Sequence, residues 1–342
     1  MSMRSELGES PDVVERVVNG AADQVNALAR AVRGRTIDFV LIAARGTSDH
    51  AAIYAKYVLG SRNGLPVALA APSLVSIYGT PLRLHNALVL GISQSGRSPD
   101  VVADLEDARR QGALTAVITN DRFSELAAAA EYVIELEAGP EVAVAATKTY
   151  LAEIAILAML SSTLSGDATS AAQLGALPAA LREALLVEDA VARLAQGRAG
   201  DDRCVVLARG FHYATAREWA LKLKELAYVL ADPYSAADFQ HGPIALIEAG
   251  FPVLAVATTG PALDGMAQLL QHLHEARARL LVLSDATDLL DLGDSVPLPA
   301  VPEWLSPLVA ILPAQLYAYH LAVARGLDTE APRYLSKVTL TR

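Results

Sequence analysis

The sequence contains very little cysteine, since Cys204 is the only one among 342 residues. A single thiol excludes an intramolecular disulfide framework and any metal site built from several cysteines. Cys204 opens an apolar run, which indicates an inert thiol in the core. His272 and His274 are also poor metal ligands, because side chains at i and i+2 on a helix point apart. We therefore expect no metal site.

Aromatic residues and positive charge are also scarce. Phe, Trp and Tyr make up 5% of the chain, so Ala, Val and Leu must fill the core that a hydrophobic content of 53% predicts. Lys and Arg number 28 against 38 Asp and Glu, which gives a formal net charge of -10. Nucleic-acid-binding proteins usually carry an excess of basic residues, so we expect no nucleic-acid partner. A small anionic ligand remains compatible, because one local pocket can override the net charge.

Long apolar segments that could target or anchor the chain are missing as well. The first six residues, MSMRSE, contain no apolar signal core, so we expect a cytoplasmic protein. The most apolar stretch, 307–324, is interrupted by Pro313, Gln315 and His320. This pattern predicts a buried helix, and we expect no membrane contact. A length of 342 residues suggests about two domains.

The chain contains an internal repeat with an offset of 164 residues. This offset aligns Arg45 of FVLIAARG with Arg209 of CVVLARG, and Gly96 of GISQSG with Gly260 of AVATTG. Two further landmarks share the offset: AVITND with LVLSD, and residues 147–160 with 311–324. Four landmarks on one offset predict two copies of one folding unit.

Each copy alternates short apolar runs with helical segments. The runs of the first copy contain β-branched residues and are expected to form strands at 37–44, 67–71, 87–92, 114–119 and 132–136. Helical patterns lie between them, at about 49–59, 99–111 and 124–129, and another begins at residue 147. This alternation predicts an α/β fold in which each copy is a parallel β-sheet covered by helices on both faces.

These patterns divide the chain into five parts. We expect a helical lead-in at 1–33, a first unit at 34–165, a linking helix at 166–197, a second unit at 198–325 and an irregular tail at 326–342. Ligands of parallel sheets bind beyond the carboxyl ends of the strands. The turns that follow the strands are therefore the places to look for a site.

Two turns of the first unit are rich in hydroxyl groups. Residues 45–48 read RGTS after the first expected strand, and residues 93–98 read SQSGRS after the third. Both place small hydroxyl residues at the mouth of a helix, where free N–H groups and the helix dipole favour an anion. Helix capping explains either turn alone equally well, but the two together favour a phosphate site.

The sequence lacks the motifs that bind the phosphates of nucleotides. Neither GxxxxGK[ST] nor GxGxxG is present, so ATP and dinucleotides are not expected. The matching turns of the second unit, 210–212 and 258–260, lack most of the hydroxyl groups. We therefore expect phosphate to bind only in the first unit.

A charged helix is expected in the second unit at 217–230. Glu218, Lys222 and Glu225 stand at i, i+4 and i+7 and share one face. By periodicity alone, this pattern favours two helix-stabilising ion pairs worth about 0.2–0.5 kcal/mol each. Residues 234–243 follow as a long polar loop, in which His241 is a catalytic candidate. Lys337 either reaches over a site or is solvated.

The motifs RGTS, GISQSG, VAATKTY, EWALKLKE and QHGP resemble the sugar isomerase (SIS) domain family. Within it, residues 30–342 are similar to the isomerase half of glucosamine-6-phosphate synthase and to its stand-alone deaminase relatives. The resemblance implies a flavodoxin-like fold in each half and a phosphosugar ligand. It also implies proton transfer and imine formation, which need no metal or organic cofactor.

The resemblance assigns roles by position. Glu225 matches the base that moves a proton between C1 and C2, and Lys222 matches a lysine near that base. His241 matches the histidine that opens the sugar ring, which in the synthase comes from the neighbouring subunit and so implies a homodimer. Lys337 matches the lysine that forms an imine with the open-chain ketose. The positions that match phosphosugar-binding residues are Gly46, Thr47, Ser48, Ser93, Gln94, Ser95, Ser98 and Val144.

The sequence also departs from the synthase. It begins Met1-Ser2 where the synthase has a nucleophilic cysteine, so we expect no use of glutamine as a nitrogen source. Ala146 replaces a serine and Arg97 a glutamate, and the surrounding motifs look more like the deaminases. We predict an isomerase/deaminase that converts glucosamine 6-phosphate to fructose 6-phosphate and ammonia. The alternatives are the isomerase component of a fructose-6-phosphate aminotransferase, a fructosamine-phosphate deglycase and a non-catalytic phosphosugar sensor.

Overall fold

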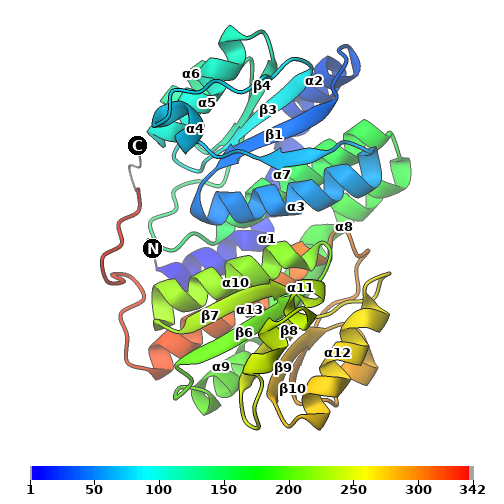
Figure 1. Cartoon of the computed structure of the whole chain (residues 1–342), viewed down its shortest axis with the longest axis vertical. Coiled ribbons are helices and arrows are strands. Elements are labelled where there is room, and N and C mark those ends of the chain that lie inside the picture. The colour runs from blue at the N-terminus through cyan, green and yellow to red at the C-terminus, as the bar shows by residue number, and fades with distance from the viewer. Residues whose placement is uncertain (1, 339–342) are drawn as a thin grey trace. The chain divides into compact units, whose positions relative to one another are not determined.

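The computed structural model describes residues 2–338, which form two compact units. The first-sheet unit contains residues 12–141, 148–176 and 336–338, and the second-sheet unit contains residues 2–11, 142–147 and 177–335. Helices α1 (Met3–Gly20) and α8 (Ala168–Ala184) each begin in one unit and end in the other. Figure 1 labels the elements of both units.

Five parallel strands form the sheet of the first-sheet unit, in the order β2-β1-β3-β4-β5. Strands β3 and β4 are buried along their whole length, as their continuous apolar runs predict. The strand order is flavodoxin-like and reverses direction between β1 and β3, where sheets of this order bind their ligands. The strands are β1 (Phe39–Ala44), β2 (Val67–Leu69), β3 (Ala87–Ile92), β4 (Leu114–Thr119) and β5 (Tyr132–Glu135).

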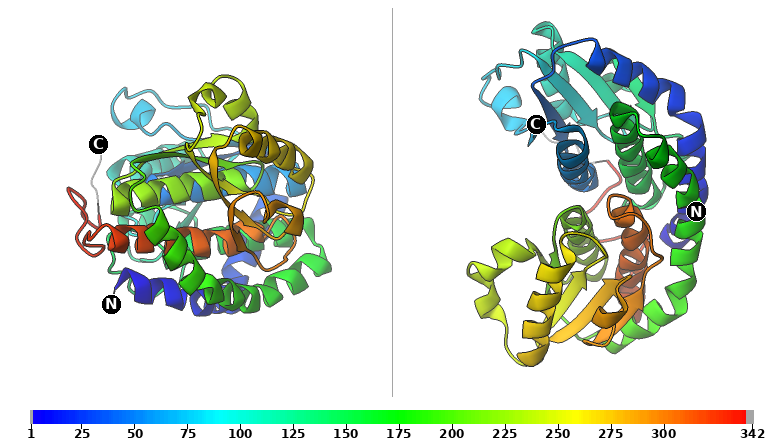
Figure 2. Two further views of the ribbon diagram at one scale, coloured as in Figure 1. Left: turned by 90° about the horizontal axis from the view of Figure 1, so that it is seen from below. Right: turned by 90° about the vertical axis from the view of Figure 1, so that its right-hand side faces the viewer.

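Helices cover both faces of this sheet (Figures 1 and 2). On one face α2 and α3 pack against α7, and on the other α5 packs against α4 and α6. A core cluster that includes Val89, Leu105 and Leu126 lies between the sheet and the second of these layers. The helices are α2 (Ala22–Arg33), α3 (Gly46–Asn63), α4 (Ser73–Ser76), α5 (Pro99–Arg110), α6 (Glu125–Ala129) and α7 (Lys148–Ser165).

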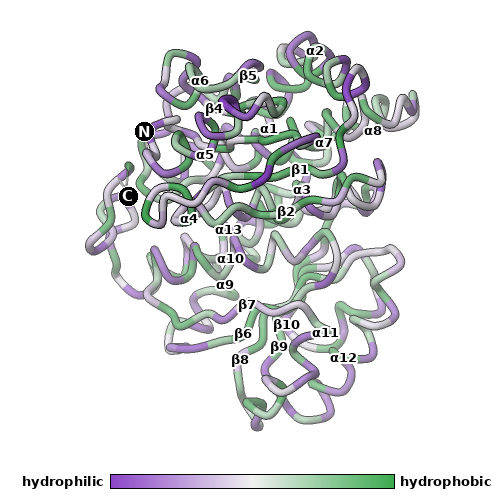
Figure 3. Tube along the Cα trace, turned by 45° about the horizontal axis from the view of Figure 1, so that its top comes forward, coloured by the Kyte–Doolittle hydropathy of each residue, from purple (hydrophilic) through white to green (hydrophobic). Residues whose placement is uncertain are grey.

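The second-sheet unit repeats this plan. Its five parallel strands lie in the order β7-β6-β8-β9-β10, which matches the first sheet strand for strand. The strands β6 and β8 are apolar along most of their length (Figure 3). The strands are β6 (Arg203–Ala208), β7 (Leu230–Ser235), β8 (Pro252–Val256), β9 (Arg279–Ser284) and β10 (Asp294–Pro297). The predicted fold class, two tandem parallel sheets covered by helices, is confirmed.

The helices of this unit also form two layers. α13 packs against α10 and α9, whereas α12 covers a core cluster that includes Phe239, Leu270 and Val282. The helices are α9 (Glu188–Gly197), α10 (His212–Ala227), α11 (Ala236–Gln240), α12 (Leu263–Glu275) and α13 (Ser306–Ala324). Short 3₁₀ turns are η1 (Leu185–Val187), η2 (Pro243–Leu246) and η3 (Thr287–Leu289).

Helix α13 contains the most apolar stretch of the sequence, and its length and hydropathy resemble those of a membrane-spanning helix. It is 19 residues long and apolar enough to cross a bilayer, but 78% of its 18-residue apolar window is buried inside the protein. Its packing against α10 and α9 accounts for that burial. The prediction of a buried helix at this position is therefore confirmed.

The prediction of a long polar loop at 234–243 is wrong. Residues 234 and 235 complete β7, and residues 236–240 form α11. Tyr234 contacts Phe239 with ring centroids 5.6 Å apart, and Ala236 and Phe239 are buried. These few apolar residues fix a strand and a helical turn in a segment whose composition is mostly polar. Pro233 is tolerated because β7 is an edge strand.

The tail after residue 326 is irregular, as predicted, and contains no helix or strand up to residue 338. The last four residues of the predicted tail, 339–342, lie outside the described part of the chain.

Candidate functional site

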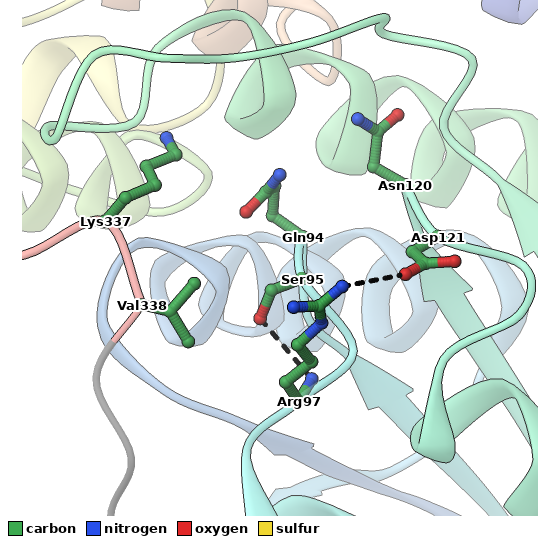
Figure 4. Close-up of a pocket in the computed structure, with 7 residues that line it drawn as sticks. All are labelled: Gln94, Ser95, Arg97, Asn120, Asp121, Lys337 and Val338. Atoms are coloured by element: carbon green, nitrogen blue, oxygen red, sulfur yellow. Dashed lines mark hydrogen bonds and ion pairs between the residues drawn. The ribbon is translucent and has the colours of Figure 1, made fainter.

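A cavity of about 200 Å³ lies at the carboxyl ends of β3 and β4 (Figure 4). It brings Gln94 and Ser95, two of the predicted phosphate-binding residues, together with Lys337, the predicted imine lysine. The position agrees with the general rule that parallel sheets bind ligands beyond the carboxyl ends of their strands. The lining residues are Gln94, Ser95, Arg97, Asn120, Asp121, Lys337 and Val338.

The turn after β3 depends on a glycine. Gly96 has a φ of +63°, and a Cβ at this position would lie 2.1 Å from Oγ of Ser124. Ser93 accepts a hydrogen bond from the Gly96 N–H at 3.2 Å, so its hydroxyl helps to shape the turn. Ser98 stands at the N-cap of α5, but its side chain makes no capping hydrogen bond. Capping therefore does not account for the Ser98 hydroxyl, whereas Ser93 and Ser95 accept backbone N–H bonds within the turn.

The turn after β1 begins α3. Gly46 has a φ of +56°, a left-handed conformation that glycine adopts without strain, and Thr47 is half-buried. Ser48 is buried, and its Oγ donates to Oε1 of Glu153 in α7 at 2.7 Å. The Ser48 hydroxyl thus has a structural partner in this state of the protein. Thr47 and Ser48 are not among the residues that line the cavity.

The remaining predicted phosphosugar position, Val144, is half-buried and belongs to the second-sheet unit. It lies in residues 142–147, whereas the cavity belongs to the first-sheet unit. The predicted binding residues are therefore distributed over the two units.

Asn120 and Asp121 line the cavity but were not predicted as site residues. The Asn120 amide holds the following loop, because its Nδ2 donates to the Gly139 carbonyl at 2.8 Å and its Oδ1 accepts from the Ala138 N–H at 3.1 Å. Asp121 lies 3.6 Å from the guanidinium of Arg97 across the cavity wall (Figure 4). Asn120 and Asp121 directly follow β4, and neighbouring parallel strands end at the same edge of a sheet. The rule that led to the turn after β3 therefore also points to these two residues.

Glu218, Lys222 and Glu225 meet in α10 as the helical spacing predicts. Nζ of Lys222 lies 3.2 Å from Oε1 of Glu218 and 2.5 Å from Oε2 of Glu225. The side chains of Lys222 and Glu218 are 0% exposed, whereas that of Glu225 is 21% exposed. This burial distinguishes the cluster from the exposed helix ion pairs that periodicity suggests, because buried charges need partners that offset their desolvation.

The neighbours of Lys222 determine its charge. Burial by itself lowers the pKa of this lysine, but the carboxylates of Glu218 and Glu225 outweigh that effect and raise its pKa. Lys222 therefore stays protonated at neutral pH. A permanently charged lysine is a poor nucleophile, so this residue suits electrostatic support of Glu225 and not imine formation.

His241 is exposed and ends α11. Within residues 2–338, its imidazole makes no hydrogen bond. Helix α10 connects parallel neighbours β6 and β7, so its last turn, with Glu225, lies at the amino edge of the sheet. His241 follows β7 and lies past the carboxyl edge, about 20 Å away by the length of a six-residue strand. The two predicted catalytic residues thus lie at opposite edges of this sheet.

The second-sheet unit has a histidine where the first has its hydroxyl-rich turns. His212 begins α10 after β6, and its Nε2 hydrogen-bonds with Oγ1 of Thr258 at 2.8 Å and Oγ of Ser306 at 2.7 Å. Burial lowers the pKa of His212 to about 3, so the imidazole is neutral. His212 therefore supplies no positive charge at the end of β6.

No group of three or more His, Cys, Asp or Glu side chains within residues 2–338 is arranged to hold a metal ion. Cys204 is buried, and that burial raises its pKa to about 12. The thiol is therefore protonated at neutral pH and does not serve as a nucleophile.

Comparison with known proteins identifies a family match. Residues 37–162 and 199–325 match the family described as SIS domain. The first segment contains β1 to β5 and the second contains β6 to β10. Each sheet therefore corresponds to one copy of that domain.

The curated relatives include aminotransferases that are longer than this chain. The glutamine–fructose-6-phosphate aminotransferase [isomerizing] of Zymomonas mobilis is 33% identical over 359 residues, which cover 98% of this chain and 58% of the relative. The enzyme of the same name from Pyrococcus horikoshii is 34% identical over 344 residues, with 98% and 57% covered. The chain thus spans a little over half the length of these relatives.

Solved structures resemble nearly the whole chain. A candidate phosphosugar isomerase from Silicibacter pomeroyi DSS-3 is 35% identical with a TM-score of 0.87, over 96% of this chain and 100% of that one. The C-terminal domain of glucosamine-fructose-6-phosphate aminotransferase from Francisella tularensis is 25% identical with a TM-score of 0.88, over 96% and 98%. Glucosamine-6-phosphate deaminase from Thermotoga maritima, 21% identical with a TM-score of 0.77 over 97% and 100%, shares the fold.

Proposed function

This chain belongs to the SIS domain family, and from that premise we propose that it is a phosphosugar isomerase that converts glucosamine 6-phosphate to fructose 6-phosphate and ammonia. The observation that carries the proposal is the cavity that joins Gln94 and Ser95 to Lys337. A phosphate held by the turn after β3 lies beside an amine that can attack a carbonyl carbon. This combination suits a sugar phosphate that reacts in its open-chain form.

The reaction needs four steps, and the chain offers a group for each of the first three. His241 transfers the proton that opens the pyranose ring, and Glu225 moves a proton from C2 to C1. The nitrogen on C2 is then an imine. The amine of Lys337 adds to C2 and displaces ammonia, and water hydrolyses the resulting lysine imine to release fructose 6-phosphate.

Lys222 supports the base in this scheme. Its pKa is raised by the two neighbouring carboxylates, so a positive charge stays next to Glu225 throughout. A fixed cation stabilises the negative charge that develops on the substrate when C2 loses its proton, and a preorganised cation does so without reorganisation. Lys222 and Lys337 therefore have different roles, one as a cation and one as a nucleophile.

We propose that the protein acts as a homodimer in which His241 serves the site of the neighbouring copy. The motivation is the placement of Glu225 and His241 at opposite edges of the second sheet, because one chain does not bring them together through that sheet. The exposure of His241 leaves its ring available to another molecule. The dimer therefore completes the site.

A second candidate is a deglycase that cleaves a fructosamine phosphate carrying an acidic substituent. Arg97 lines the cavity with its side chain 65% exposed, and its guanidinium is 3.6 Å from Asp121. A planar guanidinium binds carboxylates in a bidentate manner, and this one replaces the glutamate of the synthase pattern. The cation thus favours a substrate with a second anionic group.

Incubation of the purified protein with glucosamine 6-phosphate tests the proposal, with ammonia and fructose 6-phosphate measured separately. We expect the two products to form in equal amounts. Turnover of a fructosyl-amino acid 6-phosphate alone would establish the deglycase. Turnover of fructose 6-phosphate and ammonium alone would establish the isomerase half of an aminotransferase. Binding of these compounds without turnover of any would establish a sensor and refute the enzyme.

A further inference from the structure

Lys337 lies in the irregular segment 326–338, yet its amine has a well-defined partner. Its Nζ donates to Oε2 of Glu141 at 2.6 Å. The side chain of Lys337 is 24% exposed, and that of Glu141 is 0% exposed. Both residues belong to the first-sheet unit, and Lys337 also lines the cavity with Gln94 and Ser95. The amine at the cavity is therefore in direct contact with a buried carboxylate.

Glu141 is itself held in place by the start of α7. The backbone N–H of Thr149 donates to Oε1 of Glu141 at 3.1 Å, and the Thr149 hydroxyl donates to Oε2 at 2.8 Å. Removing a carboxylate from water is costly, and these donors offset part of that cost. An ion pair with an exposed acid would also hold the tail in place, without this cost. Holding the tail in place does not require a carboxylate that is buried and oriented by two donors.

The chemistry of an amine nucleophile explains this arrangement. A lysine ammonium cannot attack a carbonyl, because its nitrogen lone pair carries a proton. A group that removes this proton must lie within hydrogen-bonding distance of the nitrogen, and Glu141 does. We propose that Glu141 holds Nζ of Lys337 at the cavity and accepts the proton that Lys337 loses before it attacks C2. This inference rests on the proposed function, since it concerns the imine-forming role of Lys337.

The step is balanced without another reactant. Glu141 takes one proton from the ammonium, and the bond from Nζ to C2 forms as the C2=N pair moves onto the substrate nitrogen. That nitrogen receives the proton from Glu141 and a second proton from Nζ. It leaves as ammonia, and a protonated imine remains on Lys337. Fructose 6-phosphate carries C2=O instead and loses water by the same proton transfers. Glu141 is therefore ionised again at the end of the step.

Reductive trapping measures this step apart from the rest of the reaction. The whole protein is incubated with fructose 6-phosphate and cyanoborohydride, and the adduct on Lys337 is followed by mass spectrometry. We expect Glu141→Gln to slow trapping at least tenfold. Affinity for glucitol 6-phosphate, which has a phosphate but no carbonyl, should stay within twofold of the wild type.

Two further variants separate chemistry from folding. Glu135→Gln removes a carboxylate from β5 of the same unit and should trap at the wild-type rate, because Glu135 pairs with Arg122 and not with Lys337. Glu141→Asp retains the charge and should recover part of the rate that Glu141→Gln loses. Melting temperatures of all variants show whether the fold persists, and Thr149→Val offers a milder change if Glu141→Gln unfolds. That variant removes one donor to Glu141 and should slow trapping about two- to fivefold.

The outcomes distinguish this inference from the proposed function. Trapping by Glu141→Gln at the wild-type rate would overturn the role of Glu141 and leave the imine intact. Absence of any adduct in the wild-type protein would overturn the imine on Lys337, and this inference with it. A loss of glucitol 6-phosphate affinity and of melting temperature that parallels the loss of trapping would show that Glu141 only anchors the tail.

Discussion

Arg45 and Asp100 form an ion pair across the point where the strand order of the first sheet reverses. Nε of Arg45 donates to Oδ2 of Asp100 at 2.8 Å. Arg45 precedes α3 at the end of β1, and Asp100 lies in the first turn of α5 after β3. The pair therefore ties together the two turns that carry the predicted phosphate-binding residues. Sheets of this order bind ligands at that point.

We expect Arg45→Gln to lower the free energy of unfolding by about 1–3 kcal/mol, because it removes a cation that pairs with a buried carboxylate. The side chain of Asp100 is 0% exposed and that of Arg45 is 47% exposed, so part of the charge effect is screened. Affinity for glucitol 6-phosphate should also fall, because the two turns lose their link. Urea unfolding and calorimetric titration measure these effects.

Arg35→Gln is the matched control for Arg45→Gln. It breaks an exposed ion pair of the same unit, in which Arg35 lies 3.0 Å from Glu131 with side chains 43% and 32% exposed. Such a pair contributes about 0–1 kcal/mol. Equal losses of stability in the two variants would contradict the structural role assigned to Arg45.

We expect Asp104 to make the first-sheet unit less stable at neutral pH than in acid. Burial and the neighbouring Asp100 raise the pKa of Asp104 to about 6, above its ordinary value of 3.8. The folded state therefore binds this proton more tightly, and stability is lost as the pH rises through that range. Asp104→Asn should raise the unfolding free energy at pH 8 by about 1 kcal/mol, after allowance for partial solvent screening. Urea unfolding at pH 8 and pH 4 should show this gain only at the higher pH.

We expect His212 to have the opposite effect on the second-sheet unit. Burial lowers its pKa from 6.5 to about 3, so the unfolded chain binds a proton between these values while the folded chain does not. Stability is therefore lost as the pH falls below 6.5, by about 2 kcal/mol at pH 5. His212→Gln should remove most of this pH dependence in urea unfolding at pH 7.5 and 5. His241→Asn, at an exposed position, is the control, and an equal change there would contradict the prediction.

The sequence predicts the sheets well because their signals are local and repeated. Apolar runs of β-branched residues mark all five strands of the first unit, and one offset transfers the pattern to the second. The strand-end rule then leads to Gln94 and Ser95, and the family resemblance adds Lys337. The sequence does not single out Asn120, because the segment AVITND indicates the internal repeat but contains no hydroxyl-rich turn.

Side-chain partners are what the sequence does not predict. Arg45 and Asp100 are 55 residues apart, and Glu141 and Lys337 are 196 residues apart. No periodicity links such positions, because their contacts arise only when separate elements pack. Helix α11 was not predicted for a related reason, since the burial of Phe239 depends on Tyr234 and the core around it.

Glu225→Gln should abolish turnover and leave phosphosugar affinity within about twofold of the wild type, since an amide cannot carry the proton between C2 and C1. A loss of at least 10³-fold in kcat is expected, which corresponds to about 4 kcal/mol. Glu248→Gln, a change at an exposed acid of the same unit, is the control. Loss of folding in Glu225→Gln, seen as a lower melting temperature, would instead favour a structural ion pair with Lys222.

Mixing two inactive variants tests whether His241 serves a neighbouring copy. In a symmetric dimer, a hybrid of Glu225→Gln and His241→Asn chains has one site with both defects and one with neither. Random exchange makes half of the dimers hybrids, so activity should recover to about one quarter of the wild-type value. Each variant mixed with itself should stay inactive, and light scattering should show a dimer throughout. Exchange without recovery would show that Glu225 and His241 act within one chain, despite their placement at opposite edges of the sheet.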